Sequence, residues 1–141
     1  MADLSDAVLL DVLDRVVASK GSATEKLRIF SHDFMIAVIE NKSHIAIYTR
    51  EEKHLSEESN QAIQKMRREF DRKFGTLLAQ GVKDGEFEVE DVQLTSLAIG
   101  GIISWSYVWY RPEGRLSKEK TADHIANLVL AMVKAKAPQT S

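Results

Sequence analysis

Two apolar segments within residues 91–135 constrain the fold of this chain more than any other feature. The first is apolar on more than one side, and the second repeats this pattern on a broad face. A helix that is apolar on several sides must be covered on each of them. These segments therefore predict two helices that pack on the body of the protomer and also on a second copy, as a dimeric four-helix bundle. A single buried helical hairpin inside a monomer is the alternative.

The predicted dimer contact follows apolar residues spaced three or four apart along these segments. It consists of Leu94, Ala98, Gly101, Trp105, Val108, Ile125, Val129 and Met132. Gly100 and Gly101 lie in the middle of the first segment, where two glycines cost about 1–2 kcal/mol of helix propensity. Close approach of another helix or of a ligand would offset this cost.

Length and charge narrow the class of protein. The chain has 141 residues and 44% hydrophobic residues, which predicts one domain over residues 1–141. A net charge of −2 gives the molecule no general attraction to nucleic acid or anionic membranes. No basic and apolar leader opens the chain, and no run of about eighteen apolar residues occurs. We therefore expect a cytoplasmic protein with no membrane partner.

The first half of the chain contains helices with recognisable ends. Residues 6–18 place apolar side chains on one face and charged side chains on the other, and Gly21 is expected to end this helix. Ser22 and Glu25 belong to a capping box that opens the next helix, which reaches about Asn41.

The middle of the chain contains two further helices. Residues 43–55 are rich in β-branched side chains, but an isolated strand would have no partner here, so we predict a helix. Ser56, followed by two acids, caps a long helix that reaches Ala79 or Gly81. With the final pair this makes an all-α bundle of about six helices.

The chain offers little for catalysis or metal binding. It has no cysteine, and none of its histidines pairs with another at helical metal-ligand spacing; they are His32, His44, His54 and His124. No HExxH, P-loop, nucleophile elbow or dinucleotide fingerprint occurs. We therefore predict that the chain is not an enzyme and holds no metal and no cofactor.

A family resemblance comes from residues 100–117, which read GGIISWSYVWYRPEGRLS. This run resembles the closing region of TetR-family transcriptional regulators, in which a WYRPxGxLS turn joins the last two helices. The turn at residues 80–87, QGVKDGEF, and Glu25-Lys26-Leu27 are similar to the same family. The subgroup that it most resembles regulates fatty-acid and steroid degradation, and several of its members bind acyl-CoA thioesters.

The resemblance implies the ligand-binding and dimerisation domain of such a repressor. Family members open with a helix-turn-helix headpiece, and nothing in this chain matches one. DNA binding would therefore depend on a missing N-terminal headpiece, and the helix at residues 6–18 would link it to the body. An effector would shift this helix and change the spacing of the two headpieces. The implied partners are a second copy of the chain and a small apolar or acyl-CoA-like effector.

Aromatic and methionine side chains from four helices can converge as an ordinary core or as an apolar ligand cavity. The predicted lining is Phe34, Val38, Tyr48, Met66, Phe70, Phe74, Ile103 and Tyr107. Arg50 and Arg67 are the candidates to hold an anionic head group, although basic side chains on the long helix also fit a solvated face.

Two rival interpretations remain open. One is an enzyme or carrier that uses the same cavity, with Tyr48 or His32 as its reactive group. The other is an interaction module without a ligand of its own, which forms inactive heterodimers with full-length regulators.

Overall fold

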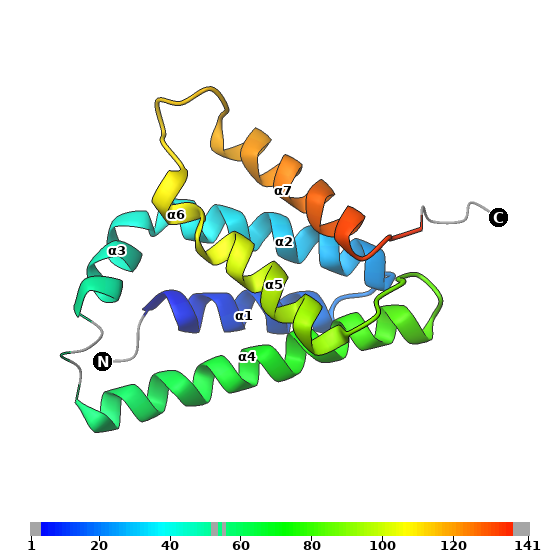
Figure 1. Ribbon diagram of the computed structural model, residues 1–141, viewed down its shortest axis with the longest axis horizontal. Helices are drawn as coiled ribbons and strands as arrows, with labels where there is room; N and C mark the ends of the chain where they lie inside the picture. Colours follow the sequence, from blue (N-terminus) through cyan, green and yellow to red (C-terminus); the bar gives the residue numbers. More distant parts are fainter. Residues whose placement is uncertain (1–3, 52–53, 55, 137–141) are drawn as a thin grey trace.

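The computed structural model describes residues 4–51, 54 and 56–136, and every regular element in these ranges is helical (Figure 1). The helices are α1 (Leu4–Ala18), α2 (Ala23–Glu40), α3 (Lys42–Glu51), α4 (Glu57–Lys83), α5 (Val92–Ser104), α6 (Ser106–Trp109) and α7 (Lys118–Met132). The prediction of an all-α bundle is confirmed. The short turn α6 is the addition to the six helices expected.

Local capping chemistry sets the start of the long helices, as the sequence predicts. The Ser22 Oγ accepts a hydrogen bond from the Glu25 backbone amide at 3.1 Å, just before α2. The Ser56 Oγ accepts from the Ser59 amide at 3.1 Å before α4. Each bond satisfies one of the amides that a helix start leaves without a partner. Gly21 adopts a φ of 142°, a conformation in which a side chain would be strained.

The structure differs from the prediction where the first apolar segment ends. The stripe through Trp105 and Val108 predicts one continuous helix, but α5 ends at Ser104 and a single turn, α6, follows. The Val108 amide donates to the Trp105 carbonyl at 3.0 Å, and the Ser106 Oγ donates to the Ile103 carbonyl at 2.6 Å. These shorter-range bonds replace the regular helical ladder and break the helix.

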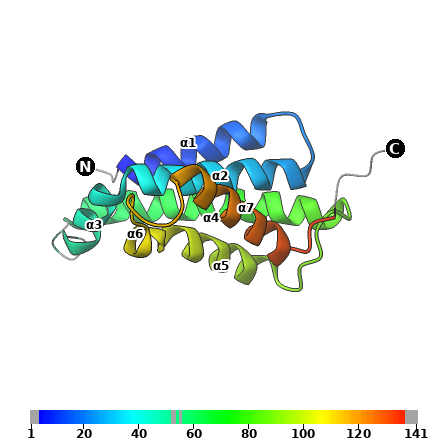
Figure 2. The ribbon, with the colours of Figure 1, turned by 90° about the horizontal axis from the view of Figure 1, so that it is seen from above.

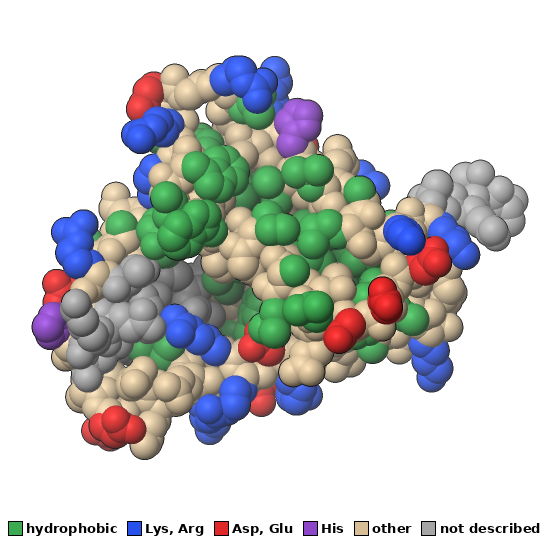
Figure 3. All heavy atoms as spheres, in the orientation of Figure 1, with side chains coloured by type: hydrophobic (Ala, Val, Ile, Leu, Met, Phe, Trp, Pro, Cys, Tyr) green, Lys and Arg blue, Asp and Glu red, His purple; other side chains and the backbone are tan. Residues whose placement is uncertain are grey.

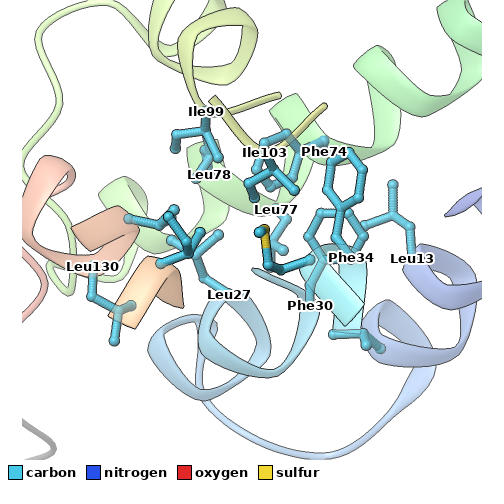
Figure 4. Close-up of a cluster of buried hydrophobic side chains, with 14 of the residues drawn as sticks. Leu13, Leu27, Phe30, Phe34, Phe74, Leu77, Leu78, Ile99, Ile103 and Leu130 are labelled. Atoms are coloured by element: carbon cyan, nitrogen blue, oxygen red, sulfur yellow. The ribbon is translucent and has the colours of Figure 1, made fainter. Parts of the chain in front are cut away.

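Helix α2 lies at the centre of the molecule. It contacts α1, α4, α5 and α7, and the two perpendicular views place α5 and α7 on the opposite side of the molecule from α1 (Figures 1 and 2). The buried side chains of these helices form one core (Figure 4). It includes Leu13 from α1, Leu27 and Phe30 from α2, Leu78 from α4 and Ile103 from α5.

The connection between α4 and α5 ties the ends of three helices together. The Glu86 carboxylate accepts hydrogen bonds from the backbone amides of Ala23 and Thr24, at 3.2 and 3.1 Å, and so caps α2 from a distant part of the chain. The Glu88 amide donates to the carbonyl of Val133, just after α7, at 2.9 Å. The connection therefore fixes the relative positions of α2, α4 and α7.

Candidate effector pocket and dimer face

Four phenylalanine rings from α2 and α4 form an aromatic cluster at the centre of the predicted pocket. Ring centroids lie 5.4 Å apart for Phe30 and Phe34, 5.3 Å for Phe30 and Phe74, and 5.7 Å for Phe34 and Phe70. The structure therefore brings together Phe34, Phe70 and Phe74, which the sequence placed in the pocket. Phe30, absent from that prediction, completes the cluster. Its position one helical turn before Phe34 on the same face is the signal that would have found it.

The other apolar residues of the predicted pocket surround this cluster. Val38 and Ile103 are buried in the same core, and Tyr107 packs against it while partly exposed. Met66 is half-buried on α4. The side chain of Tyr48 lies outside the described part of the structure. Figure 4 shows Phe30, Phe34 and Phe74 close together beside Leu13, with the Phe30 ring tilted against the other two, so these rings fill the centre of the cluster in this conformation.

The two predicted head-group arginines lie at the surface on different helices. Arg50 is exposed in the last turn of α3, and Arg67 is exposed on α4. Burial raises the pKa of Asp71 on α4, and the positive charge of Arg67 partly offsets this effect. Arg67 is therefore already engaged electrostatically with Asp71 of its own helix, whereas Arg50 lies on α3.

Most residues of the predicted dimer contact are exposed on one face. Leu94 is 64% exposed, Trp105 60%, Val108 45% and Met132 39%, while Ala98 and Gly101 are also at the surface. Figure 3 shows hydrophobic side chains gathered over α5, α6 and α7 on the face turned to the viewer. We call this surface the apolar face.

Two residues of the predicted contact lie elsewhere. Ile125 is 7% exposed and Val129 is 1% exposed, and both belong to the core of the protomer. The reason is that α7 turns this stripe toward α2, which it contacts extensively. The correction for α7 is that Leu128, at 58% exposure, lies on the apolar face in place of Ile125 and Val129. Leu97 and Ile102 of α5 are exposed apolar residues that the prediction did not include.

The glycine pair of α5 also faces outward. A Cβ atom added at Gly100 or Gly101 would meet no atom of the described chain within 4 Å. Neither glycine is therefore required for packing inside the protomer. The open surface above them leaves room for another helix to approach the α5 backbone closely.

Metal sites and membrane spans are both absent from the part of the chain that the structure describes. No group of three or more histidine, aspartate and glutamate side chains there is arranged to hold a metal ion. Within the same ranges, none of the helices combines the length and apolar character needed to cross a membrane.

Comparison with known proteins gives the class to which this fold belongs. The family model described as the tetracyclin repressor-like C-terminal domain matches residues 20–133. No curated protein matches the chain as a relative. Because the family match spans most of the sequence, the chain belongs to the TetR family of transcriptional regulators, as a C-terminal domain.

Solved structures share this fold at low sequence identity. The TetR-family regulator PfmR from Thermus thermophilus is 24% identical, with a TM-score of 0.82 over 91% of this chain and 70% of its own. The ketosteroid regulator KstR2 of Mycobacterium tuberculosis is 23% identical, with a TM-score of 0.83 over 94% of this chain and 68% of its own.

A third structure contains bound partners. AibR in complex with isovaleryl coenzyme A and operator DNA is 19% identical, with a TM-score of 0.72 over 93% of this chain and 76% of its own. At these identities the likeness establishes the fold. The resemblance seen in the sequence is thus confirmed at the level of the family and the domain.

Proposed function

We propose that this chain is the effector-binding and dimerisation domain of a cytoplasmic TetR-family repressor. It senses an apolar or acyl-CoA-type small molecule and controls DNA binding by a helix-turn-helix headpiece outside these 141 residues. One observation carries this proposal: a single domain of this family has both a buried cluster of aromatic rings and an uncovered apolar face.

The dimer contact in this proposal is the apolar face. Leu94 and Trp105 are each more than half exposed, and an apolar surface of this kind is a common mark of a protein contact. The outward-facing Gly100 and Gly101 allow close approach of a second backbone. A twofold axis would then place α5 and α7 against the same helices of the other copy.

The effector site in this proposal is the aromatic cluster. Phe70 is only partly buried, whereas Phe30 and Phe74 are fully buried, so Phe70 marks the side from which a ligand could enter. The rings fill the centre of the cluster, and an acyl chain would have to separate them. AibR, which shares the fold, holds isovaleryl coenzyme A, and this supports an acyl thioester as the class of ligand.

The route to DNA in this proposal runs through α1. Leu13 of α1 is fully buried beside Phe34 and Phe74 (Figure 4). Asp14 of the same helix binds Lys73 of α4, with Oδ1 and Nζ 2.5 Å apart. Separation of the rings would therefore displace α1 relative to α4. The effector regulates DNA binding only if its affinities for the two arrangements of α1 differ.

Thermal unfolding tests the effector site, with isovaleryl-coenzyme A, palmitoyl-coenzyme A and free coenzyme A as probes. A ligand that binds only the folded state raises the unfolding temperature. We expect at least one thioester to do so and free coenzyme A to have no effect. Phe70→Trp overfills the cluster and should abolish the rise. Ile29→Trp, at an exposed site of α2, is the matched control and should keep it.

Three results would contradict the effector site. They are no rise with either thioester, an equal rise with free coenzyme A, and a rise that Phe70→Trp leaves unchanged. Native mass spectrometry of the purified chain provides an independent readout. A homodimer with a retained acyl thioester or lipid agrees with the sensor, whereas a homodimer that binds none of the probes identifies an interaction module without its own ligand.

A further inference from the structure

A shallow hollow of about 330 Å³ lies where the loop after α6 meets α7, and the functions proposed above do not use it. Its floor is formed by Tyr110, Thr121 and Ile125, which are each at least nine-tenths buried. Its rim carries Arg111 and Arg115 from the loop, and both side chains are exposed. The hollow thus combines an apolar, well-packed base with two guanidinium groups at its edge.

The loop that carries the two arginines is held in a fixed conformation. The Gly114 amide donates to the Arg111 carbonyl at 2.9 Å, which closes a tight turn. Pro112, at the second position of this turn, restricts the backbone to the conformation that such a turn requires. A Cβ atom at Gly114 would lie only 3.0 Å from the Arg111 carbonyl oxygen, so glycine permits the close approach.

A second contact anchors the start of the loop. Lys42, at the beginning of α3, donates from its Nζ to the carbonyl of Tyr110, immediately before Arg111. The loop therefore joins two parts of the body that are distant in sequence. Because its backbone is held in place, less conformational entropy is lost when its side chains bind a ligand.

The charged side chains that line the hollow are both arginines. The residues that line it include Arg111, Arg115 and His124 and no carboxylate. In the described part of the chain, neither arginine forms an ion pair. Glu113 belongs to the same turn but does not line the hollow. Figure 3 shows lysine and arginine side chains at the top of the view, over the loop between α6 and α7, with an acidic side chain beside them.

Trp109 supplies a flat wall. Its side chain is 47% exposed and lines the hollow beside the two arginines. An indole ring stacks well on planar groups, and guanidinium groups pair with carboxylates and phosphates through two parallel hydrogen bonds. The hollow therefore combines a surface for ring stacking with groups that bind an anion.

We propose that this hollow binds a small planar organic anion, with its carboxylate or phosphate on Arg111 and Arg115 and its ring on Trp109. The site is separate from the aromatic cluster, because none of the residues that line the hollow belongs to that cluster. It therefore does not depend on the acyl thioester proposed above, and a failure of one proposal leaves the other standing.

Nuclear magnetic resonance of the full chain tests this site. The readout is the indole N–H resonance of Trp109, which Trp109→Phe distinguishes from that of Trp105. We expect 2-naphthoate and 2-naphthyl phosphate to shift this resonance saturably, and their relative affinities show whether the site prefers a carboxylate or a phosphate. Neutral 2-naphthamide lacks the negative charge, and inorganic phosphate lacks the ring. Each should bind at least about tenfold more weakly than the naphthyl anions.

Paired charge removals complete the test. Arg111→Gln with Arg115→Gln should weaken binding of both naphthyl anions by about tenfold or more. Lys20→Gln with Lys83→Gln removes the same charge from exposed sites outside the hollow and should leave binding unchanged. The proposal is overturned if neither anion shifts the Trp109 resonance, if the neutral amide binds equally well, or if the arginine variants bind as tightly as the wild type.

Discussion

Gly81 has the most restrictive environment of any glycine in the chain. A Cβ atom at this position would lie 2.1 Å from the ring of Phe87, which packs across the end of α4. The Glu86 and Phe87 amides both donate to the Gly81 carbonyl, at 2.9 and 3.1 Å. These bonds fix the backbone of Phe87 and its ring is buried in the core, so the ring cannot move away without disturbing the surrounding packing.

We predict that Gly81→Ala lowers the free energy of unfolding by about 1–3 kcal/mol, the usual cost of overpacking. Gly75→Ala, in the same helix, is the matched control, since its Cβ would meet nothing within 4 Å. Helix propensity alone should make this control about 0.5–1 kcal/mol more stable. Urea denaturation at one protomer concentration measures both. Equal stability of Gly81→Ala and the wild type would contradict the packing described.

Glu86 makes the stability of the domain dependent on pH. Burial of its carboxyl group would raise its pKa, but hydrogen bonds from Thr24, Ala23 and Ser22 outweigh burial and hold the pKa below the usual value of 4.5. The ionised form is therefore favoured in the folded state. Its contribution is fully present above pH 4.5 and is lost as the pH falls through the lowered pKa of the folded state.

We predict that Glu86→Gln lowers the free energy of unfolding at neutral pH by about 0.5–2 kcal/mol, the range for loss of a helix cap. The difference between this variant and the wild type should shrink below pH 4.5, the usual pKa of the carboxyl group. Urea denaturation from neutral pH down to about pH 3 gives the comparison. A difference that stays constant over this range would show that the charge of Glu86 has no part in capping α2.

Ser31 is a buried polar residue whose hydroxyl makes no stabilising hydrogen bond in the described structure. Its side chain is 0% exposed, and its Oγ has no hydrogen-bond partner in the described structure. A buried hydroxyl without a partner costs free energy, whereas a methyl group of similar size does not. We predict that Ser31→Ala leaves the protein as stable as the wild type or up to about 1 kcal/mol more stable. Destabilisation in the same denaturation experiment would reveal a partner for the hydroxyl.

At the scale of the elements, helix starts are the best-predicted features of the fold. Ser22 and Ser56, the two predicted caps, each accept a hydrogen bond from an amide three residues later, so the capping signal acts within a few residues and can be read from the sequence. Asp91 caps α5 in the same way, although it was not predicted to do so. The end of α5 is harder to predict from the sequence. The bonds that break it at Trp105 join residues whose types do not exclude a continuous helix.

The orientation of α7 shows a second limit of sequence reasoning. Both Ile125 and Leu128 belong to apolar stripes at helical spacing, yet Ile125 packs on the body and Leu128 is exposed. Periodicity predicts that a face is apolar, but the surface that it meets depends on helices distant in sequence. The pocket prediction named three phenylalanines of the aromatic cluster and omitted Phe30, although Phe30 lies one turn before Phe34 on the same face. The sequence also does not indicate how completely the rings fill the centre of the cluster.

The apolar face makes a specific prediction for α5. Leu94→Glu places a charge on the most exposed large apolar side chain of this helix, and should raise the dimer dissociation constant about thirtyfold or more, as expected for a contact worth about 2 kcal/mol. Gln93→Glu adds the same charge one residue away on α5 and serves as the control. Analytical ultracentrifugation over a range of concentrations measures both. Equal dimer dissociation constants for the two variants would show that Leu94 is not part of the interface.

At the scale of the whole molecule, the protomer combines a complete core with an apolar face that this core does not use. The core joins residues from α1 to α7, so the protomer can fold around it. Leu94, Leu97, Trp105 and Leu128 remain more than half exposed on α5, α7 and the turn between α5 and α6. The proposed sensor function depends on a second copy covering them, since two headpieces must be held at one spacing to read two half-sites of DNA.

Sedimentation velocity of the wild-type chain at micromolar concentration tests this dependence most directly. We predict one species with the mass of two chains, which dissociates on dilution or with Leu94→Glu. A well-folded species with the mass of one chain, unchanged up to the highest concentration measured, would contradict the proposed dimer and the sensor function that requires it.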